Sequence, residues 1–134
     1  MSDMYGFSAL ASAFADNRHC AAIYVDVSGT IRSWNRAAEI IFGYSATEAV
    51  GRRADLIVPE SLKDMHWAGF ERAVHSPWPG SRTWGPIEPR HQNGHSLALE
   101  VFLIALQTSS PAPAGGILAL FRAPVGGNDP AIPG

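Results

Sequence analysis

One stretch decides the fold: AIYVDVSGTIRSWNRAAEIIFGYS, residues 22–45. Residues 20–26 are apolar and rich in β-branched side chains, which is typical of a buried strand. Residues 27–29 then supply a turn, and residues 30–34 alternate between apolar and polar side chains as a half-buried strand does. Residues 35–43 begin with an asparagine that can cap a helix and end with a glycine that can stop it. This stretch predicts two neighbouring strands followed directly by a short helix.

Two further helix signals follow. Residues 45–48 read Ser-Ala-Thr-Glu, the pattern of a capping box. Pro59 and Glu60 suit the first turn of a longer helix, which we expect to end near Val74. That helix carries one inward-facing apolar stripe with a histidine inside it, made of Leu62, Met65, His66, Gly69, Phe70 and Ala73.

The C-terminal half predicts three more strands. Residues 81–92 indicate a strand interrupted by two prolines, which are typical of an edge position or a bulge. Asn93-Gly94 is the strongest hairpin signal in the chain, and it leads into residues 95–107, the longest expected strand. Residues 116–122 complete the set. The order of elements predicts an α+β fold, with a five-stranded antiparallel sheet and helices on one face.

The two ends of the chain differ from the middle. In residues 1–18, the residues Phe7, Leu10, Ala11 and Phe14 have helical spacing and predict an amphipathic cap helix. This stripe can cover its own sheet or make a homodimer contact. The last residues, 124–134, are rich in Gly and Pro, and we expect a disordered tail. The domain itself is expected over residues 19–123.

Composition excludes several classes of protein. The 134 residues are 46% hydrophobic, so the chain can form one domain with a core. A formal net charge of −2 gives no basic footprint for nucleic acid, and no apolar run approaches the roughly 20 residues of a membrane span. Asp3 stands where a secretory signal would carry positive charge, so we expect no such signal. The single Cys20 excludes an intrachain disulfide and a Cys-based zinc site. We therefore expect a cytoplasmic protein.

Signatures of catalysis are absent from the sequence. It contains no Gly-rich phosphate loop, no Gly-x-Ser-x-Gly nucleophile and no His-Glu-x-x-His pair. We do not expect an enzyme. His91 and His95 flank the hairpin turn and can approach one another, but a transition-metal site there would need help from a carboxylate.

Three segments together resemble a known family. Residues 22–45, the Glu48-Ala-Val-Gly-Arg52 block and the Asn93-Gly94 hairpin are similar to the corresponding parts of PAS sensor domains. The resemblance covers about residues 20–122. It implies the PAS fold and a role in signal transduction. The residues after Arg122 lack the usual link to a signalling helix, so we expect a stand-alone or trimmed sensor.

The long helix carries a narrower resemblance. Pro59-Glu-Ser-Leu-Lys-Asp-Met-His66, with Arg72 six residues on, is similar to the helix of haem-binding PAS oxygen sensors on bacterial histidine kinases. The resemblance implies haem b with its iron bound to His66, Arg72 near a haem propionate, and a diatomic gas or the redox state of the iron as the signal. One departure stands out. The arginine that steadies dioxygen in those sensors falls near Gly85 or Pro86 and is missing.

Other residues are expected to complete a haem pocket. Leu62 and Phe70 would form an apolar wall, and Gly69 would allow close approach. The indole of Trp84 is a candidate donor to a bound gas. Strand spacing selects Val101, Leu103, Leu118 and Leu120 as the far wall.

Simpler interpretations stay open at these positions. His66 would then be a core histidine bonded to a backbone carbonyl, Arg72 a solvated residue near the helix end, and Trp84 a packing residue. For the whole domain the alternatives are a ligand-free interaction module filled by its own side chains, or a PAS domain that binds another small molecule. In every case the exposed sheet face and the N-terminal helix are expected to contact a partner subunit or a signalling protein in trans.

Overall fold

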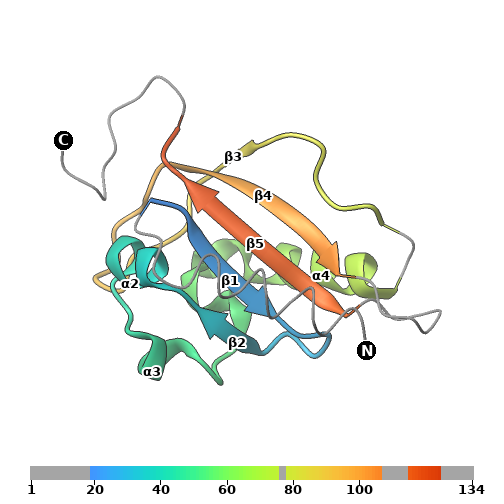
Figure 1. Ribbon diagram of the computed structural model, residues 1–134, viewed down its shortest axis with the longest axis horizontal. Coiled ribbons are helices and arrows are strands. Elements are labelled where there is room, and N and C mark those ends of the chain that lie inside the picture. The colour runs from blue at the N-terminus through green and yellow to red at the C-terminus, as the bar shows by residue number, and fades with distance from the viewer. Residues whose placement is uncertain (1–18, 76–77, 107–114, 125–134) are drawn as a thin grey trace.

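The computed structural model describes residues 19–75, 78–106 and 115–124. The expected N-terminal helix and the C-terminal tail lie outside these residues. The described residues form a five-stranded antiparallel sheet with helices, as the sequence predicted. The strands are β1 (Ala21–Val25), β2 (Ile31–Trp34), β3 (Gly85–Ile87), β4 (Leu99–Leu106) and β5 (Gly116–Arg122), in the spatial order β2-β1-β5-β4-β3 (Figure 1).

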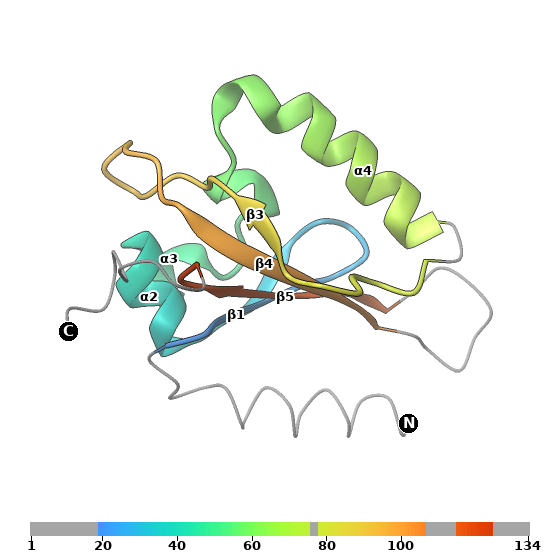
Figure 2. The ribbon, with the colours of Figure 1, turned by 90° about the horizontal axis from the view of Figure 1, so that it is seen from above.

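Short helical segments connect β2 to β3. They are α2 (Arg36–Phe42), α3 (Ala46–Ala49), two 3₁₀ turns at Ala54–Ile57 and Glu60–Leu62, and the longer α4 (Lys63–His75). Figure 2 shows α4 standing over one face of the sheet. We call this the cavity face, and the opposite side the outer face.

Asn35 joins the first strand to the first helix. Its side-chain oxygen accepts hydrogen bonds from the backbone N–H of Ala38 at 3.0 Å and of Ala22 at 2.9 Å. Its amide donates to the carbonyl of Cys20 at 2.9 Å. The predicted helix cap is thus confirmed, and the same side chain also ties α2 to β1. Gly43 ends α2 with a φ of 86°, a backbone conformation that glycine adopts without strain.

The predicted capping box at the start of α3 is confirmed. Ser45 accepts from the N–H of Glu48 at 3.1 Å, and the Glu48 carboxylate accepts from the N–H of Ser45 at 2.8 Å. The start of α4 differs from the prediction that Pro59 and Glu60 form its first turn. Pro59 precedes a 3₁₀ turn rather than occupying the helix itself, and α4 begins at Lys63.

Two strands are shorter than expected. In the segment 81–92, Gly85–Ile87 is the part that pairs with β4 as a strand, at the edge of the sheet. Pro86 and Pro89 have no N–H to donate to a ladder, which limits this pairing. Ser81 makes a separate contact with β4, donating its N–H to the carbonyl of Leu103 at 2.8 Å. The segment 95–107 enters the sheet only at Leu99, because its first residues belong to the hairpin.

Successive strand residues alternate between the two faces. On β5, Ile117, Ala119 and Phe121 belong to the main core on the cavity face. Leu118 and Leu120 belong to a second apolar cluster on the outer face, with Ala22, Cys20, Tyr24, Trp84, Phe102, Ile104 and Leu106. The expectation that Leu118 and Leu120 line a pocket under α4 is therefore corrected.

Candidate functional site

An apolar cavity of about 770 Å³ lies between α4 and the cavity face of the sheet. Its volume falls within the range of about 300–1,000 Å³ that small-molecule sites occupy. The sheet contributes Ile23, Val25, Ile31, Trp34, Ile87, Val101, Leu103, Ile117, Ala119 and Phe121. The helical side contributes Leu62, Met65, His66, Gly69, Phe70, Arg72 and Ala73.

Contacts on both sides of α4 fix the rotation of the helix. Phe70 and Val74 are buried in the core. Trp67 donates from its indole N–H to Asp55 at 2.9 Å, and the guanidinium of Arg53 lies 4.2 Å from the Trp67 ring centroid. These anchors hold His66 on the wall of the cavity.

The imidazole of His66 lies between aromatic rings. Its centroid is 4.7 Å from that of Trp67 in an edge-on arrangement and 6.4 Å from that of Phe70 in a stacked one. The Nδ1 atom is buried and has no hydrogen-bond partner among the described residues. Burial lowers the pKa of His66 below its usual 6.5, against the opposing charge of Asp55, and the charge of Arg53 lowers it further. The lowered pKa favours the neutral ring at pH 7.

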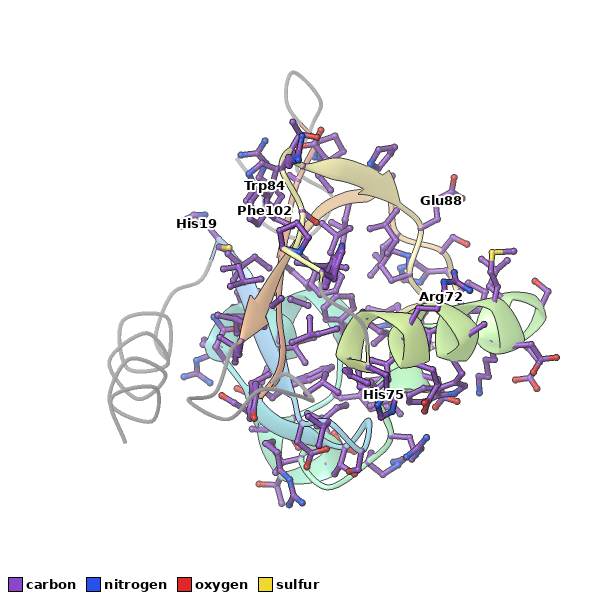
Figure 3. The ribbon with its side chains drawn as sticks, turned by 90° about the vertical axis from the view of Figure 1, so that its right-hand side faces the viewer. His19, Arg72, His75, Trp84, Glu88 and Phe102 are labelled. Atoms are coloured by element: carbon purple, nitrogen blue, oxygen red, sulfur yellow. The ribbon has the colours of Figure 1, made fainter. Side chains whose placement is uncertain are left out.

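The mouth of the cavity is partly polar. Arg72 comes from α4 and Glu88 from the segment that follows β3 (Figure 3). Leu62 and Met65 also reach the cavity, with 43% and 70% of their surface exposed. They therefore belong to its rim.

Seven of the ten predicted cofactor-binding residues line this cavity: Leu62, His66, Gly69, Phe70, Arg72, Val101 and Leu103. Trp84 does not. Its ring packs against Phe102 on the outer face, 5.6 Å between centroids, and the guanidinium of Arg122 lies 4.0 Å from it (Figure 3). The predicted role of Trp84 as a donor to a bound gas is therefore excluded by its position.

Sequence reasoning missed part of the cavity wall. Ile117, Ala119 and Phe121 replace the expected Leu118 and Leu120, and Glu88 and Trp78 also reach the cavity. The segment GILALF of β5 is apolar at every position, so the sequence does not show which of its residues face the cavity and which face outward. The face is set by strand pairing: Ala119 pairs with Ile23 on β1, and paired residues lie on the same face of a sheet.

Two other expectations concern metals and membranes. The rings of His91 and His95 do meet, stacked with centroids 4.7 Å apart. Within the described ranges, no three His, Cys, Asp or Glu side chains are grouped so as to hold a metal ion. In that same part of the chain, no helix has the length and apolarity that crossing a bilayer requires.

Comparison with known proteins shows which fold this chain shares. Residues 10–75 match the family model described as PAS fold. The PAS domain of a protein from Colwellia psychrerythraea has 23% identity and a TM-score of 0.72, over 88% of this chain and 96% of that one. The chain therefore has the PAS fold.

Other solved structures share the fold. A domain of a sensory box sensor histidine kinase/response regulator from Geobacter sulfurreducens gives 21% identity and a TM-score of 0.64, over 89% of this chain and 96% of that one. A LOV protein from Rhodobacter sphaeroides gives 16% identity and a TM-score of 0.68, over 92% of this chain and 68% of that one.

Proposed function

We propose that this PAS domain is a sensor that holds haem b in the cavity under α4, with His66 as the ligand of the iron. The observation that carries the proposal is the state of His66. A core histidine normally has a hydrogen-bond partner, whereas Nδ1 of His66 is buried without one among the described residues. A neutral imidazole on the wall of an apolar cavity is suited to bind iron.

The other lining residues fit the same group. The aliphatic walls suit a flat macrocycle, and Gly69 leaves space beside the imidazole, since a Cβ there would meet only the Arg72 guanidinium, at 3.9 Å. Arg72 at the mouth can pair with a propionate. Glu88 at the same mouth would repel one, so we expect the propionates on the side of Arg72.

Bound haem iron supplies reversible binding of a diatomic gas or a one-electron redox change. The residues of this chain would orient the group and exclude water. The sheet residues on the wall, including Val101, Leu103 and Ala119, offer no side-chain donor, and the Trp34 indole already donates to Tyr44 O at 2.9 Å. We therefore expect a gas complex without a donor from these strands, unlike sensors that use a distal arginine.

The signal would leave through the sheet. Strands β4 and β5 carry cavity residues on one face, and on the other face they carry Phe102 and Leu120, against whose cluster Trp84 packs. A shift of these strands on ligand binding would alter the outer face, where a second subunit or a signalling protein in trans would read it.

The test is an absorption spectrum of protein purified from haem-replete cells, beside His66→Ala and the control His95→Ala, which alters an exposed hairpin histidine. We expect a Soret band in the wild type and the control, and its loss or shift in His66→Ala. A wild type that stays colourless and does not take up added hemin would contradict the proposal.

A second candidate is a PAS domain for another apolar small molecule, which the mostly aliphatic lining of the cavity favours. Native mass spectrometry separates it from the first, because such a ligand adds mass without a Soret band. A ligand-free interaction module is disfavoured by the open volume of about 770 Å³, since its own side chains would have to fill that space.

A further inference from the structure

A second cleft, separate from the haem cavity, gathers positive charge. It has a volume of about 460 Å³ and lies between the first 3₁₀ turn, the start of α4 and the Asn93-Gly94 hairpin. Its charged lining residues are Arg52, Arg53, Lys63, Arg90 and Asp55. Four cations against one carboxylate leave three excess positive charges, in a chain whose formal net charge is −2.

Two of these cations are already engaged. Arg53 donates to the carbonyl of Ser28 at 2.7 Å and lies over the Trp67 ring, and Lys63 is 3.1 Å from the carboxylate of Glu60. The one carboxylate of the cleft, Asp55, accepts the indole N–H of Trp67.

The other two cations have no such partner. Arg52 and Arg90 form no ion pair with any residue that the structure describes. Glu48 is the acidic neighbour of Arg52, and its pKa is lowered first by hydrogen bonds with Ser45, then by one with Gln92 and last by the charge of Arg52. The two guanidinium groups are therefore available to a ligand.

The hairpin side of the cleft is held in place by the backbone. Arg90 donates its N–H to the carbonyl of Ile57 at 2.8 Å, and Gln92 donates to that of Phe42 at 2.9 Å. The ring of His91 lies directly against Gly43, where any side chain would collide with it. The position of Arg90 relative to the 3₁₀ turn is thus fixed before a ligand arrives, which lowers the entropic cost of binding.

We propose that this cleft binds a small anion that carries a phosphate or diphosphate group, with Arg52 and Arg90 as its main contacts. Guanidinium groups bind phosphate oxygens through paired hydrogen bonds. The cleft is larger than a single ion needs and falls within the range of small-molecule sites, about 300–1,000 Å³. The site does not depend on the identity of the ligand under α4.

The test is calorimetric titration of the full chain with inorganic pyrophosphate and, separately, with a nucleoside diphosphate. Amide chemical shifts, followed by NMR, locate the site. We expect saturable binding with shifts at Arg52, Arg90 and Asn93, weaker at high salt. Tighter binding of the nucleoside diphosphate would mean that the cleft also contacts the nucleoside, and equal affinities would assign it the phosphates alone.

The variants are Arg52→Gln and Arg90→Gln, alone and combined, with Arg82→Gln as an exposed control outside the cleft. Each lost guanidinium should raise the Kd roughly tenfold or more, because hydrogen bonds to charged groups are strong. The control should leave the Kd unchanged. Absence of saturation by either anion, or equal affinity in the double variant and the wild type, would overturn the proposal.

Discussion

His66 is half-buried, and its Nδ1 atom is buried without a hydrogen-bond partner among the described residues. An unpaired buried nitrogen costs about 1–3 kcal/mol, and the ring that carries this one lines the cavity. Its helical neighbours Met65 and Trp67 have other surroundings: Met65 is largely exposed at the rim, and Trp67 is bonded to Asp55. The imidazole ring lines the cavity, and we propose it as the group on this helix that binds a ligand there.

Replacement of His66 by Phe should change how the ligand-free protein responds to pH. Burial depresses the folded-state pKa of His66, so below about pH 6.5 the unfolded chain binds a proton that the folded chain does not. Wild-type stability should therefore fall relative to His66→Phe as the pH drops from 7 to 5. Urea unfolding at both pH values measures this difference. An equal loss of stability in the two proteins would contradict a lowered folded-state pKa for His66.

Within α4, Gly69 is the residue that the helix itself does not favour. A glycine inside a helix costs about 0.5–1 kcal/mol relative to alanine. An added Cβ would meet only the guanidinium of Arg72, at 3.9 Å, so space is not the reason for this glycine. The helix gives up stability at a position that borders the cavity.

Gly69→Ala should therefore stabilise the ligand-free protein by about 0.5–1 kcal/mol. The same methyl group would protrude beside the space that we assign to haem, so the variant should bind hemin more weakly. Denaturant unfolding and hemin titration measure the two effects. A variant that is both less stable and unchanged in hemin affinity would show that Gly69 serves the packing of α4.

The junction of β1 and α2 depends on Asn35. Its side chain satisfies two backbone N–H groups and one carbonyl, and it is buried. Asn35→Ala should cost about 2–3 kcal/mol, as it removes a helix cap and leaves the buried N–H of Ala22 unpaired. Ser45, whose cap hydrogen bond is exposed, offers a comparison, with about 1 kcal/mol expected for Ser45→Ala. Equal losses in the two variants, measured by urea unfolding, would mean that Asn35 acts only as a cap.

Sequence patterns predicted the local turns and caps but not which face of the sheet each β5 residue occupies. Some features depend only on neighbours in the chain, and the sequence predicts them. They are the turns at Gly29 and Gly94, the Asn35 cap and the Ser45 capping box. The face of each β5 residue depends instead on pairing with β1 and β4, which lie far away in sequence. An apolar run without alternation carries no information about that pairing, and Leu118 and Leu120 were therefore assigned to the wrong face.

At the scale of the whole molecule, one sheet separates two apolar regions. The cavity side holds His66 and the open volume under α4, and the outer face holds the cluster around Phe102 and Trp84. The helical stripe predicted His66 and its neighbours on α4 as wall residues because they recur every three or four positions. Glu88 and the residues that line the cationic cleft come together only through the fold, so no local pattern could have found them.

The central claim is that His66 binds the iron of haem inside this cavity. The most direct test is hemin titration of the apoprotein, followed at the Soret band, for the wild type and for His66→Gly with and without added imidazole. We expect one-to-one uptake by the wild type, loss of the axially ligated spectrum in His66→Gly, and its recovery when imidazole occupies the vacated space. Wild-type protein that takes up no hemin, or a His66→Gly spectrum identical to that of the wild type without imidazole, would contradict the claim.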